Sequence, residues 1–125
     1  MKSYNKQIFD VAKAMNANFT SKAFQLRAAW GYAIQIAFTG SSINGTFKLQ
    51  GSADPIDERP ADADNPDVTN WTDITGSSSM VSVAGTLLWD VTTAAYNYVR
   101  LVYTDGSGGA SNGTVNGRIN MKGIV

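Results

Sequence analysis

Carboxylates are the side chains of this sequence that could most readily do chemistry, and most of them gather in one stretch. Residues 53–67 hold six of the ten acidic side chains and all three prolines. Carboxylate oxygens bind Ca²⁺, but the stretch lacks the glycine and the final glutamate of an EF-hand loop, and its prolines restrict wrapping around an ion. We interpret it as an exposed acidic loop and expect no metal site. The six residues are Asp54, Asp57, Glu58, Asp62, Asp64 and Asp67.

Catalytic chemistry finds little support in the residue types. Two neighbouring carboxylates such as Asp57 and Glu58 could suggest glycoside hydrolysis, which needs them at a fixed separation across a rigid cleft. A loop interrupted by prolines does not provide that rigidity. The chain has no cysteine and no histidine, which removes thiol nucleophiles, histidine triads and the usual ligands of zinc, iron and copper. The glycine-rich run 106–109 lacks the lysine and the following helix of a phosphate-binding loop. We expect no enzyme, no catalytic residue and no cofactor.

Aromatic side chains offer a second kind of chemistry, because their faces can stack on sugars. Trp30 and Trp89 lie inside alternating runs where packing in the core is the default. Trp71 and Tyr98 are better candidates for contact at the surface. A glycan therefore remains an alternative ligand, beside packing in the core or between subunits.

Arg100 lies between Tyr98 and Val102 on its strand face. It could stack on an aromatic ring, or pair with a carboxylate such as Asp73 or Asp90 and lock two sheets together. Direct contact with a partner is the alternative. The candidate interface or ligand-contact residues are thus Trp71, Tyr98 and Arg100.

Length and composition indicate what must position these residues. The chain has 125 residues, enough for one domain, and 43% of them are hydrophobic while 16% are charged, as in a folded protein. Ten basic residues balance ten acidic ones, so no net field favours nucleic acid or a membrane surface. Neither a signal peptide nor an apolar stretch of about 20 residues is apparent. We expect synthesis in a cytoplasm without secretion.

Strict alternation predicts a strand at 30–38. Trp30, Tyr32, Ile34, Ile36 and Phe38 would share one face, and the small residues between them would let another layer or chain approach the other face. Shorter runs at 46–52, 71–74, 80–83, 86–91, 96–104 and 115–122 read as further strands separated by turn signals. This pattern predicts an all-β antiparallel sandwich of jelly-roll type with seven to nine short strands; an up-and-down barrel is the alternative.

Residues 1–19 are ambiguous, since Ile8, Ala12, Met15 and Phe19 recur at helical spacing. We favour an N-terminal arm or edge strand, followed by a single sandwich domain over 20–125. Both faces of the strand at 96–104 carry apolar groups. We therefore expect part of it, or of the strand at 30–38, to be covered by the arm or by a neighbouring subunit.

The order of motifs in the rest of the chain resembles that of short β-sandwich proteins encoded among the structural genes of tailed bacteriophages. The resemblance covers residues 30–123. It is carried by the segments 47–55, 70–78, 88–91, 98–104 and 116–123. The run Tyr98-Val99-Arg100-Leu101 is also similar to penultimate strands of discoidin-type carbohydrate-binding sandwiches. Fold alone does not determine function.

The phage resemblance implies a non-enzymatic virion protein, most readily a capsid decoration or cement protein acting through symmetric contacts. Its partners would be capsid or tail subunits and further copies of itself, with no nucleic acid and no membrane. It would reside in the virion after synthesis in the host cytoplasm. A tail or head-fibre adaptor and a carbohydrate-binding module for host attachment are the alternatives.

Overall fold

The computed structural model describes residues 2–26, 29–55 and 68–123, and these form strands, turns and loops without any helix. Seven strands have three or more residues, and four have only two. The strands are β1 (Lys2–Gln7), β2 (Lys13–Ala14), β3 (Phe19–Thr20), β4 (Phe24–Gln25), β5 (Ala29–Thr39), β6 (Gly45–Ser52), β7 (Thr72–Asp73), β8 (Ser79–Val81), β9 (Gly85–Val91), β10 (Tyr98–Asp105) and β11 (Thr114–Gly123).

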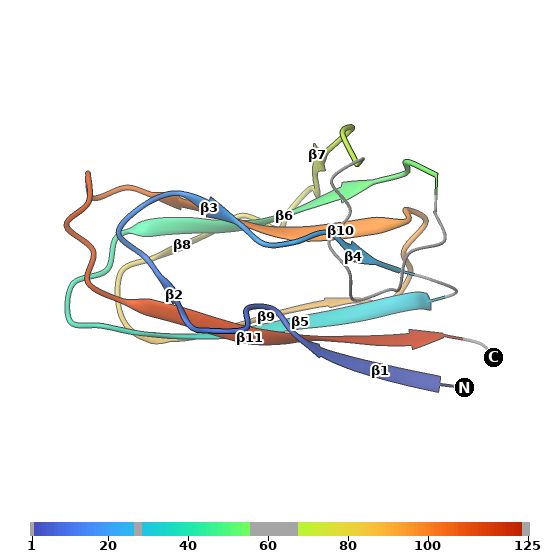
Figure 1. Cartoon of the computed structure of the whole chain (residues 1–125), viewed down its shortest axis with the longest axis horizontal. Helices are drawn as coiled ribbons and strands as arrows, with labels where there is room; N and C mark the ends of the chain where they lie inside the picture. Colours follow the sequence, from blue (N-terminus) through green and yellow to red (C-terminus); the bar gives the residue numbers. More distant parts are fainter. Residues whose placement is uncertain (1, 27–28, 56–67, 124–125) are drawn as a thin grey trace.

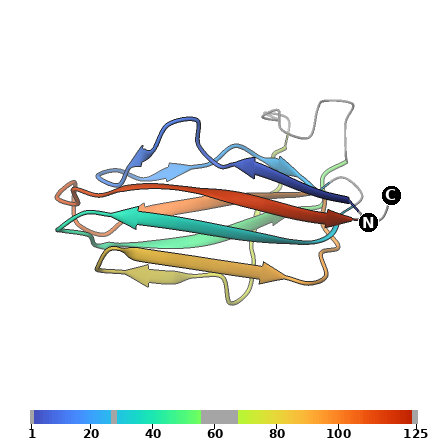
Figure 2. The same cartoon turned by 90° about the horizontal axis from the view of Figure 1, so that it is seen from below.

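The strands form two antiparallel sheets that pack face to face (Figure 1). The first sheet has the order β1-β11-β5-β9, with β2 also paired to β11 (Figure 2). The second has the order β3-β10-β6-β7, with β4 also paired to β10 and β8 to β6. We count β1 with β2, β3 with β4, and β7 with β8 as single positions, and number the resulting eight positions along the chain. The first sheet then has the order 1-8-3-6 and the second has the order 2-7-4-5. This interleaving is that of a jelly roll, so the predicted all-β sandwich is confirmed.

The longest strand, β5, follows the alternation in its sequence. Tyr32, Ile34, Ile36 and Phe38 point between the sheets and are at most 4% exposed. The residues opposite them on β11 and β9 face the core as well, because opposite residues of an antiparallel pair lie on the same face of the sheet. The core of the sandwich is therefore built from the inner faces of both sheets.

Trp30 departs from this pattern, and the expectation that it packs in the core is wrong. Its side chain is 46% exposed. Gly31 and Ala29 pair with successive residues of β11, Lys122 and Gly123, so that Trp30 is the extra residue of a β-bulge. A bulge bends the strand and redirects the side chain, which alternation cannot foresee. Trp89, by contrast, packs against the core.

An aromatic cluster fills one end of the core. The ring of Tyr103 lies 4.8 Å from that of Phe47 and 5.0 Å from that of Phe19, measured between centroids. The Tyr103 hydroxyl donates a hydrogen bond to the carbonyl of Met15 at 3.1 Å. A Cβ atom at Gly45 would overlap the Tyr103 ring, so a residue without a side chain is required there.

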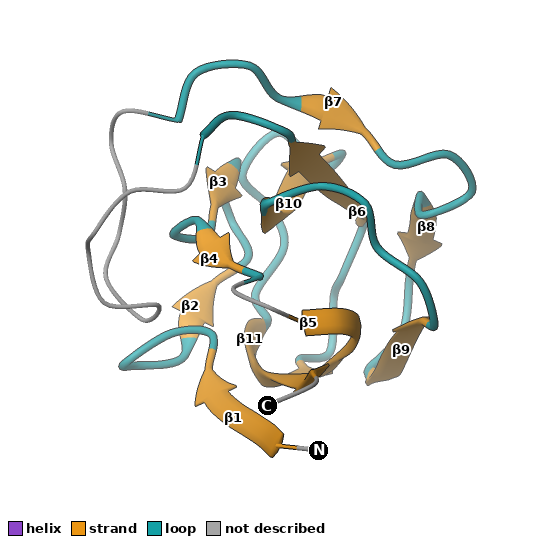
Figure 3. Ribbon diagram, turned by 90° about the vertical axis from the view of Figure 1, so that its right-hand side faces the viewer, coloured by secondary structure: helices purple, strands orange, loops and turns teal. Residues whose placement is uncertain are grey.

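The N-terminal segment runs along one side of the sandwich, opposite β8 and β9 (Figure 3). β1 pairs with β11 from Lys2 to Gln7, and β2 continues along the same strand. The chain then crosses to the second sheet, where β3 and β4 pair with β10. Ile8, Met15 and Phe24, at most 2% exposed, point into the core along this path.

The chain leaves the second sheet at the end of β6. The acidic stretch expected at 53–67 lies largely outside the described residues, including Asp57, Glu58, Asp62, Asp64 and Asp67. At its start, Asp54 accepts hydrogen bonds from the backbone of Thr69 and from the side chain of Asn70. These hydrogen bonds hold the pKa of Asp54 below its usual value.

Candidate interaction surfaces

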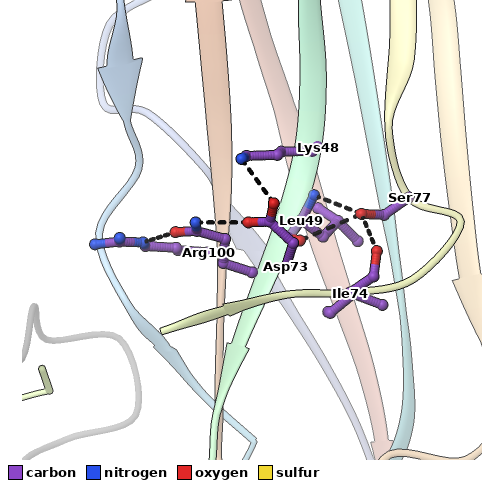
Figure 4. A network of polar contacts seen from close by, with 7 residues as sticks. Lys48, Leu49, Asp73, Ile74, Ser77 and Arg100 are labelled. Carbon is purple, nitrogen blue, oxygen red and sulfur yellow. Dashed lines mark hydrogen bonds and ion pairs between the residues drawn. The ribbon is translucent and has the colours of Figure 1, made fainter. Parts of the chain in front are cut away.

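A row of polar side chains crosses the outer face of the second sheet. The strand register places Arg100 beside Gln50, and Gln50 beside Asp73. Arg100 Nε donates to Gln50 Oε1 at 2.8 Å, Gln50 Nε2 donates to Asp73 Oδ1 at 2.8 Å, and Lys48 Nζ lies 2.9 Å from Asp73 Oδ2 (Figure 4). The hydrogen bonds from Gln50 and Lys48 lower the pKa of Asp73.

Arg100 also stacks on an aromatic ring. Its guanidinium lies 4.2 Å from the centroid of the Trp71 ring, and Trp71 Nε1 donates to the carbonyl of Val68 at 3.1 Å. Of the two predicted arrangements, stacking is therefore present, and Arg100 reaches Asp73 only through Gln50. Because Trp71, Gln50 and Asp73 all lie on the second sheet or beside it, Arg100 does not lock the two sheets together as expected. Contact of Trp71 and Arg100 with a partner stays a prediction.

Tyr98 was predicted to be a surface residue, and this is wrong. Its side chain is 1% exposed and packs with Ala23 and Val68 in a small cluster on the outer side of the second sheet. Its hydroxyl donates to the carbonyl of Pro55 at 3.3 Å and lies 3.4 Å from the Gln25 amide nitrogen, which donates to it. At Tyr98 the cover comes from Ala23 and Val68 of the same chain, which lie outside the predicted arm of residues 1–19.

The outer face of the first sheet is different, because small residues such as Ala33 and Ala37 lie on the outer face of β5, one of its interior strands. Ala33 on β5 lies between Asn120 on β11 and Asp90 on β9. Around it is a depression of about 460 Å³ whose rim includes Trp30 and Leu88. The sequence indicated the small face of this strand. It did not indicate that Trp30 lies beside it.

The described residues expose five large hydrophobic side chains, and three of them lie on one side of the sandwich. Met80 on β8 is 82% exposed, Val83 in the following turn is 73% exposed, and Leu88 on β9 is 62% exposed. We call Ser79–Val91 the β8–β9 edge. β9 is the last strand of the first sheet and pairs only with β5 within the described part of the chain. We did not single out this surface from the sequence, although the near-absence of charge over 79–91 was a signal for it.

The buried polar side chains that the structure describes have hydrogen-bond partners. The hydroxyls of Tyr32 and Tyr96 lie 2.6 Å apart, and burial raises the pKa of Tyr32. Within the described ranges, every buried side-chain nitrogen or oxygen atom has a hydrogen-bond partner. The same residues contain no group of three potential metal ligands and no helix long and apolar enough to cross a membrane.

The fold and these surfaces define a small jelly-roll sandwich with two differently built outer faces. No family model matches the chain, and no curated protein matches it. A solved structure, that of the SPBc2 prophage-derived protein YomS, is similar in fold, with a TM-score of 0.54 and 12% sequence identity. The similarity covers 96% of this chain and 92% of that one. At this identity it shows a shared fold alone.

Proposed function

We propose that this chain is a non-enzymatic structural protein of a tailed phage, a rigid sandwich that adheres to other subunits of the particle. The supporting observation is the fold shared along almost its whole length with a prophage-derived protein. The exposed apolar side chains of the β8–β9 edge supply the means of adhesion, because large apolar side chains in solvent at one edge of the fold offer surface that a partner can bury.

A decoration or cement protein of the capsid is the role we favour among virion proteins. A compact domain repeated around a symmetric particle binds firmly through many modest contacts. The described residues form no fibrous repeat and no long helix, which distinguishes the chain from a fibre shaft. A tail or head-fibre adaptor is the variant of this proposal with a different position on the particle.

Immunogold labelling of intact particles tests the proposal. Antibodies raised against the purified chain are applied to particles made by the phage or prophage that encodes it, with antibody pre-absorbed on the chain as the control. Regular labelling over the heads supports decoration, and labelling confined to tails supports the adaptor variant. Unlabelled particles, with the chain present only in the soluble lysate, contradict the proposal.

Glycan binding is a second candidate, and the Trp30 depression is the observation that favours it. Half-exposed Trp30 could stack on a sugar, while Asp90, Asn120 and Lys122 offer polar groups around the same depression. Trp71 is less suited, since Arg100 occupies one face of its ring. A glycan array decides: saturable binding abolished by Trp30→Ala but retained by Met80→Ala supports this function, and no binding by the unmodified chain rejects it.

A further inference from the structure

The outer edge of β9 is an unblocked pairing surface. In an antiparallel sheet, a strand directs about half of its backbone donors and acceptors to each side. β9 uses one side for β5, and no backbone hydrogen bond joins its other side to any described residue. Its seven residues, Gly85 to Val91, contain no proline, no lysine and no arginine. Natural proteins protect edge strands with such residues or with bulges, and β9 has none of these in its pairing with β5.

The opposite edge of the same sheet shows that such protection is used elsewhere in this molecule. There β1 and β2 are separated by five residues, and Lys6 and Lys13 lie on the edge segments. Two short interrupted strands carrying lysines are poor templates for another strand. β9, uninterrupted and with Asp90 as its sole charge, is a good one.

We propose that β9 pairs antiparallel with β9 of a second copy of this chain across a two-fold axis centred on Leu88. A two-fold axis normal to the sheet places one residue opposite its own copy, because opposite residues of an antiparallel pair share a face. Leu88 is the middle residue of β9, so this register uses all seven residues. It continues the first sheet from one copy into the other.

The side chains of β9 are complementary in this register. On the outer face, exposed Leu88 meets Leu88 of the second copy, and Thr86 lies opposite Asp90, to which its hydroxyl can donate a hydrogen bond. On the inner face, Leu87 lies opposite Trp89. A register centred on Leu87 instead places Asp90 opposite Ala84, and one centred on Asp90 opposes two carboxylates. Of these three registers, the Leu88-centred one places Asp90 opposite a hydrogen-bond donor and keeps all seven residues of β9 paired.

This pairing deepens the proposed function and rests on it for its biological use, since it names the second copy as a partner of the β8–β9 edge. It can nevertheless be tested on the purified chain alone. Particles that are labelled although the chain does not dimerise would refute the pairing and leave the proposed function standing. If the purified chain dimerises but particles are not labelled, the pairing stands and the proposed function is refuted.

Single cysteines give a direct test of the register, because the natural chain has none. In Leu88→Cys, the two thiols lie opposite one another within disulfide reach, so mild oxidation should convert most of the protein to a covalent dimer. Thr86→Cys is the matched control on the same strand and face. Its thiols would be four residues out of register and should cross-link far less. The proposal is overturned if both variants cross-link equally, or if neither variant cross-links.

Charge substitutions test the energetics by sedimentation over a range of concentrations. Leu88→Lys sets two ammonium groups against each other at the axis, and we expect the dimer dissociation constant to rise about tenfold or more. Thr86→Lys adds the same charge to the same strand but opposite Asp90, and should leave the dimer intact or tighten it. Circular dichroism confirms that both variants are folded. An unmodified chain that is monomeric at every concentration, or a Thr86→Lys variant that dissociates as Leu88→Lys does, contradicts the proposal.

Discussion

The two lateral sides of the sandwich differ in how they end. On one side the N-terminal segment crosses from the first sheet to the second and inserts Ile8, Met15 and Phe24 into the core. On the other side β8 and β9 leave Met80 and Leu88 in solvent. The first side, which we call the closed side, buries apolar surface within one chain and so stabilises the fold. The second, the open side, leaves apolar surface available for contact with other molecules.

Truncation on the closed side should have the largest effect on folding. Phe24→Ala removes a fully buried ring that β4 contributes to the core, and we expect a loss of about 3–5 kcal/mol in the free energy of unfolding. Urea denaturation, monitored by tryptophan fluorescence, measures this change in the free energy of unfolding. A loss below about 1 kcal/mol would mean that the N-terminal segment is not part of the folding unit.

The link between the N-terminal segment and the aromatic cluster should be next in size. Tyr103→Phe keeps the ring but removes the hydroxyl that donates to the buried carbonyl of Met15. Leaving that acceptor without its partner should cost about 1–3 kcal/mol. Asn112→Ala, which removes hydrogen bonds at the exposed end of the sandwich, is a control of similar chemistry. The urea midpoints compare the two, and a smaller loss for Tyr103→Phe would contradict this view of the closed side.

Acid should weaken the molecule through a loop beside the closed side. The Asp105 carboxylate accepts hydrogen bonds from Ser107 and Gly109, and these lower its pKa below the ordinary 3.8. Because the pKa of Asp105 is lower in the folded than in the unfolded state, the ionised carboxylate stabilises the fold. This stabilisation is fully present above about pH 4 and is lost as the pH falls through the folded pKa. Thermal unfolding between about pH 5 and pH 2 should therefore be less pH-dependent in Asp105→Asn. Unchanged pH dependence would exclude Asp105 as a contributor.

The smallest effect on folding is expected on the open side. Leu88→Ala removes an exposed side chain, so the unfolding free energy of the monomer should change by no more than about 0.5 kcal/mol. The measurement is made at concentrations below the dimer dissociation constant, so that it reports on the monomer and can be compared directly with Phe24→Ala. A loss of several kcal/mol would show that Leu88 is part of the core, and the contrast between the two sides would disappear.

The alternation over 32–38 was sufficient to predict which side chains of β5 face the core, because a period of two has one structural meaning in a half-buried strand. It failed at Trp30, where a bulge inserts one residue and reverses the face. For the N-terminal segment, the spacing of Ile8 and Met15 suited a helix as well as a strand. Pairing with the last strand, distant in sequence, decides between them.

The candidate surfaces were harder to predict. Stacking of Arg100 on a ring was foreseen from its aromatic neighbours, but which ring depends on how the chain returns after residues 56–67. The burial of Tyr98 depends on Val68 and Ala23, which no local pattern connects to it. Edge positions likewise follow from the order of strands in the sheet, so the exposure of β9 becomes apparent only with the topology.

The position of β11 has a consequence for how the protein folds. β11 is an interior strand of the first sheet, between β1 and β5, although β1 and β11 are far apart in the sequence (Figure 2). Until β11 inserts between them, β1 and β5 have unpaired backbone groups on the sides that face each other. Closure of the first sheet therefore depends on non-local β pairing, which is typically slow, and the partly folded chain passes through a stage that is vulnerable to aggregation.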